Sequence, residues 1–217
     1  MKAHHRDSKN GLTLIEVLIV IAVIAVLAAV VLANSSKRTR YHQRVACLSN
    51  LKNVGLSFRQ WSVGGPPGYP MSFSTNNGGT LEYVAAGEPF RHLQVMSNEL
   101  YAVKLLVCPA DARKPARDFT ALNNSNVSYF VGVDAQEEYP AMFLTGDRNL
   151  TNEVPLPANG IMELTSLSKI GWTAEMHDGK GNVGLSDGSV QSLNVERLRE
   201  ANSNSGVWTN RLAMPVE

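Results

Sequence analysis

The chain begins with a long apolar run, which continues into a segment with amphipathic spacing. Twenty-two residues lie between Leu12 and Ala33 inclusive, and only Thr13 and Glu16 among them are polar. Because a helix rises about 1.5 Å per residue, this run predicts an apolar helix of roughly 33 Å, long enough to cross a bilayer. A buried helix in the core of a globular protein rarely needs so long an unbroken apolar run.

The helical pattern continues beyond this run. Residues 35–61 contain no proline, and apolar residues recur there at spacings of three and four. Such spacing predicts one apolar stripe along a helix. The stripe consists of Val45, Leu48, Leu51, Val54 and Phe58. We therefore expect one helix from Leu12 to about Trp61, roughly 75 Å long, apolar all round in its first half and amphipathic in its second.

The remaining sequence consists of short apolar segments separated by turns. The Gly- and Pro-rich stretch at 64–70 predicts the end of the helix. Segment 99–107 fits either a short helix or a strand, whereas β-branched and aromatic residues at 127–133 predict a buried strand. Further strand candidates lie at 141–144, 160–164, 172–177, 183–185 and 190–193. Between the last two, Asp187-Gly188 predicts a two-residue hairpin turn.

The predicted fold class is therefore α+β, with a long N-terminal helix packed on a globular head that contains an antiparallel sheet. The chain has 217 residues, of which 44% are hydrophobic. Roughly 150 of them follow residue 62, which is enough for one domain with its own core.

Overall charge gives no argument for a nucleic-acid partner, although the basic residues after the apolar run leave DNA uptake open as an alternative. The formal net charge is +1, so there is no global basic excess and we expect no specific nucleic-acid partner. Four basic residues do follow the apolar run, namely Lys37, Arg38, Arg40 and Arg44. Their simplest role is contact with lipid head groups or with neighbouring subunits.

A recognisable signal stands at the start of the apolar run. A short basic leader ends in Gly11, and Glu16 is the fifth residue after it. The segment Gly-Leu-Thr-Leu-Ile-Glu resembles the class III signal of type IV pilins and type II secretion pseudopilins. This resemblance implies cleavage between Gly11 and Leu12 by prepilin peptidase and N-methylation of Leu12. It also implies an assembly role for Glu16, whose carboxylate would pair with the terminal ammonium of a neighbouring subunit.

The resemblance also implies an organisation and a function. The chain would comprise a leader peptide at 1–11, a transmembrane helix half at 12–34, an amphipathic helix half at 35–62 and a β-rich head at 63–217. Its function would be that of a structural subunit in a type II secretion pseudopilus or type IV pilus-like filament. Its partners would be prepilin peptidase, other pilin or pseudopilin subunits, the inner-membrane assembly platform and membrane lipid. It would cross the bacterial inner membrane once, with an extracytoplasmic head, or stand in the filament.

Two alternatives compete with that interpretation. An ordinary secretory signal could be cut near Val31–Ala33, but its apolar core would normally be shorter than this one. An uncleaved anchor could instead carry an extracytoplasmic binding module for glycan or calcium. The count of Lys and Arg at the two ends of the apolar run weakly opposes a cytoplasmic leader. The cleavage motif and the cysteines outweigh that count.

Cys47 and Cys108 are the only two cysteines. An even count in an exported domain favours one disulfide between them, and the alternative is two reduced, buried cysteines. Because the two thiols are far apart in sequence and lack a Cys-x-x-Cys motif, a metal site at the cysteines is not expected.

The C-terminal part carries a second resemblance. His177, nine residues and then Asp187-Gly188 resemble a segment found in many pilin-like proteins of planctomycete- and verrucomicrobia-type bacteria. His177 could pair with Asp178 or Asp187 for acid–base work. No nucleophile motif accompanies them, so we expect no catalytic residues and no enzyme. The simplest interpretation is a hairpin in which His177 bonds the backbone.

Calcium is the one cofactor that the sequence suggests. Asp178, Asn182 and Asp187 offer oxygen ligands, although Lys180 interrupts the alternation of an EF-hand loop. Segment Gly146–Asn149 is predicted to be a turn, in which Asp147 and Asn149 bond the local backbone.

Overall fold

The computed structural model describes residues 13–216, except for the side chains of residues 31–39. The chain forms two compact units, of which the first ends at Tyr41 and the second begins at His42. Helix α1 (Leu14–Gly64) starts in the first unit and ends in the second. The prediction of one long N-terminal helix is therefore confirmed. The four-segment division drawn from the sequence stays a prediction.

The first unit begins with a reciprocal cap. The backbone N–H and the hydroxyl of Thr13 both donate to Oε2 of Glu16, at 2.7 and 2.8 Å. In return, the backbone N–H of Glu16 donates to the hydroxyl of Thr13 at 3.4 Å. This Thr-x-x-Glu arrangement is a capping box, which satisfies donors that the first turn of a helix leaves open. Glu16 thus has a local partner in the single chain.

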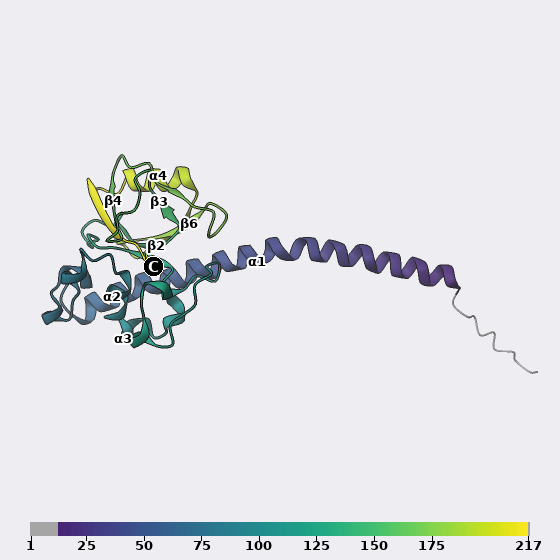
Figure 1. Ribbon diagram of the computed structural model, residues 1–217, viewed down its shortest axis with the longest axis horizontal. Coiled ribbons are helices and arrows are strands. Elements are labelled where there is room, and N and C mark those ends of the chain that lie inside the picture. The colour runs from purple at the N-terminus through teal and green to yellow at the C-terminus, as the bar shows by residue number, and fades with distance from the viewer. Residues whose placement is uncertain (1–12, 217) are drawn as a thin grey trace, which may run out of the picture. The chain divides into compact units, whose positions relative to one another are not determined.

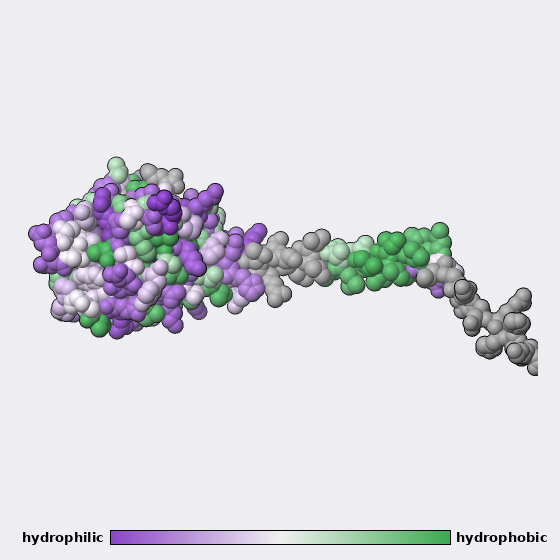
Figure 2. Space-filling model, turned by 90° about the horizontal axis from the view of Figure 1, so that it is seen from below, coloured by the Kyte–Doolittle hydropathy of each residue, from purple (hydrophilic) through white to green (hydrophobic). Residues whose placement is uncertain are grey.

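Apart from Glu16, every residue of α1 between 14 and 30 is apolar. Every large apolar side chain there is exposed, from 46% at Val17 to 80% at Leu14. Figure 2 shows this stretch as a continuous hydrophobic surface. Within the described residues, no helical stretch combines the length and the hydrophobicity needed to span a membrane.

The second unit contains two antiparallel sheets. The larger has the strand order β4-β8-β1-β2-β6-β7, and each neighbouring pair is antiparallel. Its strands are β1 (Tyr129–Gly132), β2 (Phe143–Asp147), β4 (Ile161–Thr165), β6 (Gly181–Leu185), β7 (Val190–Leu193) and β8 (Thr209–Ala213). The smaller pairs β3 (Leu150–Thr151) with β5 (Gly171–Trp172). The α+β prediction with an antiparallel sheet in the head is thus confirmed.

Short helices complete this unit (Figure 1). The α-helices are α2 (Pro89–Gln94), α3 (Ser97–Leu100) and α4 (Val195–Ser203). Single 3-10 turns occupy Pro70–Ser72, Thr75–Asn77, Leu81–Tyr83, Val103–Leu106, Phe119–Ala121 and Asn124–Asn126. Segment 99–107, which the sequence left open, contains the end of α3 and one 3-10 turn and forms no strand.

The central strands of the large sheet, β1, β2 and β6, are buried on both faces. Tyr129 and Val131 of β1 belong to the core that contains α1, whereas Phe130 belongs to a second core with α4. This explains why residues 127–133 form a continuous apolar run instead of an alternating one. The first core takes Cys47, Leu51, Val54, Phe58 and Trp61 from α1. The predicted stripe is confirmed at Leu51, Val54 and Phe58, whereas Leu48 is half-buried outside this core and Val45 is 49% exposed.

The β6–β7 hairpin is confirmed, but its turn is longer than predicted. The backbone N–H of Leu185 donates to the carbonyl of Ser189, and the N–H of Gly188 donates to the carbonyl of Leu185, both at 2.9 Å. The loop therefore holds three residues, Ser186 to Gly188, instead of two. Gly188 closes it at φ +84°, the left-handed position that a three-residue hairpin loop requires.

Candidate metal centre

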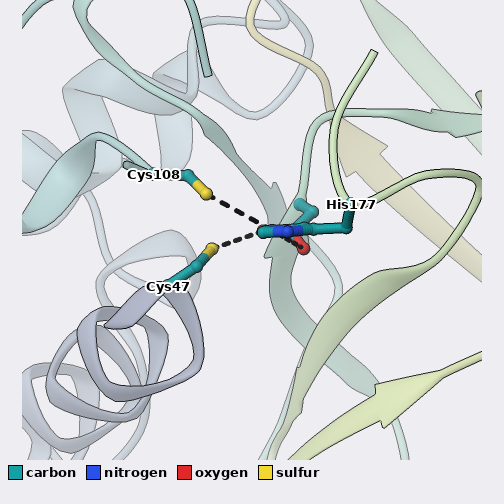
Figure 3. Close-up of side chains that lie close together, drawn as sticks. Cys47, Cys108 and His177 are labelled. Atoms are coloured by element: carbon teal, nitrogen blue, oxygen red, sulfur yellow. Dashed lines mark hydrogen bonds and ion pairs between the residues drawn. The ribbon is translucent and has the colours of Figure 1, made fainter. Parts of the chain in front are cut away.

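Four side chains from separate segments converge inside the second unit (Figure 3). Cys47 comes from α1, Cys108 from the segment after the 3-10 turn at 103–106, Asp147 from the end of β2, and His177 from the loop before β6. Their ligand atoms all lie within 4.8 Å of one another. Two sulfurs, one imidazole nitrogen and one carboxylate oxygen are thus gathered at one point.

The contacts within this cluster are close and dry. The thiol of Cys47 donates to Oδ1 of Asp147 at 3.1 Å. Nε2 of His177 lies 3.3 Å from Sγ of Cys108 and 3.4 Å from Oδ2 of Asp147. The side chain of His177 is 1% exposed, and the other three residues are fully buried. Bulk water therefore does not solvate these groups.

Hydrogen-bond donors surround the cluster. Oδ2 of Asp147 accepts from the backbone N–H of Asn182 at 2.7 Å and from its Nδ2 at 2.9 Å. The hydroxyl of Tyr129 lies 3.5 Å from Sγ of Cys47, and the backbone N–H of Ala110 donates to Sγ of Cys108 at 3.4 Å. Each acidic member of the cluster thus has a neighbour that can donate to its charged form.

Burial and mutual contact shift the protonation of the cluster. Burial raises the pKa of Asp147 to about 7, although the charge of His177 opposes it. Burial also raises the pKa of Cys47 far above its ordinary value. The hydrogen bond from Cys47, helped by His177, lowers the pKa of Cys108 to about 6. Burial acts to lower the pKa of His177, but Cys108 and Asp147 outweigh it and the pKa is raised.

The loop that carries His177 has an unusual backbone and a dedicated anchor. His177 and Asp178 both adopt φ +53°, a left-handed conformation that is uncommon for residues other than glycine. Nδ2 of Asn149 donates to the carbonyls of Thr173, Met176 and Lys180, each at 3.1 Å. The amide of Asn149 therefore fastens both ends of this loop.

A buried ion pair joins the segment of Cys108 to that of Asp147. Arg148 binds Asp111 with two parallel hydrogen bonds, Nε to Oδ2 at 2.8 Å and Nη2 to Oδ1 at 2.9 Å. The side chain of Asp111 is 1% exposed and that of Arg148 is 21% exposed. The hydroxyl of Ser128 also donates to Asp111, at 2.7 Å.

These contacts correct part of the prediction for Gly146–Asn149, because Arg148 and Asn149 form a turn whereas Gly146 and Asp147 belong to β2. Asp147 and Asn149 do not bond the local backbone of a simple turn, because Asp147 belongs to the cluster and Asn149 bonds the loop of His177. Gly146 is required by packing, since a Cβ there would lie 2.5 Å from the ring of Phe130. A close approach of this kind leaves room only for glycine.

The structure brings the two cysteines together without a bond between them. Cys47 and Cys108 are free, buried thiols. The structure thus has the alternative of two reduced cysteines and not the disulfide that the sequence favoured. The spacing of the two cysteines does not indicate a metal site, because the histidine and the carboxylate that complete the group of ligand atoms come from two other segments.

The two ends of the His177–Asp187-Gly188 motif do not meet. The sequence suggested that His177 bonds the backbone of a hairpin. Its side chain instead contacts Cys108 and Asp147 of the cluster. Asp187 lies beyond the other end of β6, where Oδ1 accepts from the backbone N–H of Ser189 at 2.8 Å. The carbonyl of Asp187 accepts from Arg59 of α1. The motif therefore makes two separate attachments.

The proposed calcium ligands are also not gathered. Asn182 is buried at the start of β6, where its amide donates to Asp147. Asp187 lies in the turn after the end of the same strand, and Asp178 is exposed in the loop before it. The three side chains do not form one ligand set. Of the processing residues, Gly11 and Leu12 lie outside the described residues.

Asp147 is the member of the cluster that the sequence did not identify. The available signal was its position, because a strand buried at every residue ends in a carboxylate. A charged residue with no exposed surface requires a partner. The short polar motif around it made a surface turn the simpler expectation.

Comparison with known proteins identifies the N-terminal signal. Residues 6–32 match the family model described as the prokaryotic N-terminal methylation motif. This motif is the prepilin signal of type IV pilins and pseudopilins, so the chain carries that signal. It indicates a type IV pilin-like protein that prepilin peptidase processes. No curated protein and no solved structure matches the chain.

Proposed function

We propose that the protein is a structural subunit of a type II secretion pseudopilus or type IV pilus-like filament. The observation that carries this proposal is a prepilin signal followed directly by a helix with an apolar surface on every side. A large exposed apolar surface requires a partner of its own kind or a lipid. Before assembly the partner is the bacterial inner membrane, which the chain crosses once, with its head on the extracytoplasmic side.

Filament assembly would replace lipid by other copies of the same helix. The apolar run Leu12–Ala33 begins and ends beyond the residues whose side chains the structure describes. Its described part, 14–30, presents branched and small side chains all round, which suits close packing among several helices. The assembly platform of the inner membrane would supply these copies, and the heads would coat the filament. The protein then acts by assembly and not by catalysis.

Glu16 would provide the register between subunits. Cleavage after Gly11 would free an ammonium at Leu12, which the same peptidase would then methylate, only four residues from the carboxylate. An ion in lipid is costly unless it is paired. In the single chain the carboxylate bonds Thr13. In the filament it would bind the ammonium of a neighbour.

Two measurements test this proposal. The N-terminal mass of the protein from native-host membranes should correspond to a chain that starts at Leu12 with one added methyl group. An intact Met1 would instead favour a plain anchor with a binding module, and a start near Asn34 would favour a soluble secreted domain.

Substitutions at Glu16 separate its charge from its capping role. Glu16→Ala and Glu16→Gln should both insert into the membrane but enter sheared filament fractions poorly. Glu16→Gln keeps an oxygen that can accept from Thr13, so it is the matched control for the cap. Normal incorporation of Glu16→Gln would show that the charge is not needed and would refute the pairing.

A further inference from the structure

We propose that Cys47, Cys108, Asp147 and His177 bind one zinc ion, which fastens α1 to the head. Each of the four side chains is of a type that ligates zinc, with two sulfurs, one imidazole and one carboxylate, and four protein ligands are the number that a structural zinc site takes. This proposal does not depend on the filament function, because it concerns only contacts within the second unit.

Two of the distances match a tetrahedral ion closely. Zn–S bonds of about 2.3 Å and Zn–N bonds of about 2.0–2.1 Å place sulfur and nitrogen about 3.5 Å apart at tetrahedral angles. Sγ of Cys108 and Nε2 of His177 are 3.3 Å apart, and Sγ of Cys47 and Oδ1 of Asp147 are 3.1 Å apart. These two pairs need to open by only a few tenths of an ångström to admit the ion, and all four ligand atoms already lie within 4.8 Å of one another.

The ligand atoms also point to the same place. Figure 3 shows His177 directed between the two cysteines. The imidazole reaches this position from a loop that holds His177 and Asp178 in left-handed conformations. Such strain persists only where surrounding contacts impose it, and it is common at ligand-binding positions.

Charge balance supports a dication. Zinc binding would release to solvent the protons that the cysteines and His177 hold, because the ion takes thiolates and a neutral imidazole. Two thiolates and one carboxylate would then carry three negative charges. The ion neutralises two of them. The donors from Tyr129, Ala110 and Asn182 face the ligands and stabilise the remaining charge. Outer donors of this kind orient the ligands of metal sites and tune them.

The donor set selects zinc among common ions. Calcium and magnesium take oxygen ligands, whereas thiolate with imidazole suits zinc. Four protein ligands in a buried position leave no open place for water or substrate, which is the pattern of a structural site. The rival outcome is a disulfide between Cys47 and Cys108. It would leave the buried side chains of Asp147 and His177 with no metal ion to bind.

The experiment measures zinc in the full-length protein. The protein is purified in detergent without chelator from cells supplied with Zn²⁺. Its metal content is then measured by inductively coupled plasma mass spectrometry. We expect about one zinc per chain. His177→Gln should lose at least nine-tenths of it. His42→Gln, an exposed histidine on the same helix as Cys47, is the matched control and should keep it.

Two further measurements keep the proposal testable if His177→Gln does not fold. Wild-type protein reconstituted with Co²⁺ should show the strong visible absorption of tetrahedral cobalt with thiolate ligands. Tyr129→Phe removes only the hydroxyl beside Cys47 and should weaken zinc binding about tenfold in competition with a chromogenic chelator. Absence of zinc and of the cobalt spectrum would overturn the proposal. If the metal-free protein, denatured without reductant, has a mass two hydrogens below that of the reduced protein, the cysteines form a disulfide instead.

Discussion

Replacing Arg148 by glutamine should destabilise the head by about 3 kcal/mol, because it leaves the carboxylate of Asp111 buried without its cation. Arg148 supplies two of the hydrogen bonds that Asp111 accepts. The side chain of Asp111 is 1% exposed, so water cannot replace the lost guanidinium.

The magnitude follows from what remains around the carboxylate. Removing one partner of a buried pair costs about 3–5 kcal/mol. Ser128 still donates to Asp111 at 2.7 Å, and the backbone N–H of Arg113 donates at 3.3 Å. These two bonds and the 21% exposure of Arg148 place the expected loss at the lower end of that range.

The assay is urea unfolding of the full-length protein in detergent, followed by tryptophan fluorescence. Trp61 and Trp172 are buried in the two cores of the head and report its unfolding. Arg117→Gln is the matched control, because Arg117 pairs with Asp118 at the surface and is 88% exposed. Exposed pairs often contribute nothing measurable, so this control should unfold as the wild type does.

The dependence on pH and a second substitution decide the mechanism. In the wild type, burial raises the pKa of Asp111, but the bonds from Arg148 and Ser128 outweigh it and the pKa is lowered. Without Arg148 the folded pKa should lie above the unfolded one, so the penalty is full at pH 7 and fades as pH falls toward 4. Adding Asp111→Asn should recover part of the loss. Equal losses of unfolding free energy in Arg148→Gln and Arg117→Gln would refute this account. So would a loss in Arg148→Gln that stays the same when Asp111→Asn is added.

Two other predictions concern buried polar groups. Burial lowers the pKa of His92 to about 4. The unfolded chain therefore takes up a proton near pH 6.5 that the folded chain refuses, and stability should fall by about 2 kcal/mol between pH 7 and pH 5. His92→Gln should lack that part of the pH dependence in urea titrations, and an unchanged slope would count against it. Asn149→Ala removes the donor to three carbonyls around His177 and should cost about 2 kcal/mol in the same titrations. A loss below about 0.5 kcal/mol would mean that the loop does not need this anchor.

Local patterns predicted the parts of the fold that depend on neighbours in sequence. The apolar run and the stripe from Leu48 to Phe58 define α1, since helical spacing is visible over a few turns. The strand near Tyr129 and the β6–β7 hairpin are also predicted by local patterns, namely β-branched and aromatic residues in the strand and Asp187-Gly188 at the turn. Val45 was assigned wrongly to the buried stripe, because periodicity identifies a face but not where its partner ends.

The cluster could not be predicted because it depends on tertiary contacts alone. Cys47, Cys108, Asp147 and His177 lie on four segments, and no spacing in the sequence states that these segments meet. Asp147 in particular follows a glycine and precedes two polar residues, which is typical of a surface turn. Only the pairing of β2 with β6 places its carboxylate beside Asn182 and inside the protein.

The two contacts that flank β6 relate the length of this strand to the spacing of two positions on α1. His177 meets α1 through the cluster at Cys47, and Asp187 meets it at Arg59. Those two helix positions are twelve residues apart, or about 18 Å along the axis. The six steps from Gly181 to Asp187, which comprise strand β6 and the start of the turn after it, cover at most about 20 Å, a similar span. The length of β6 thus matches the separation of Cys47 and Arg59 along α1, so inserting or deleting one residue in the strand should displace one of the two attachments.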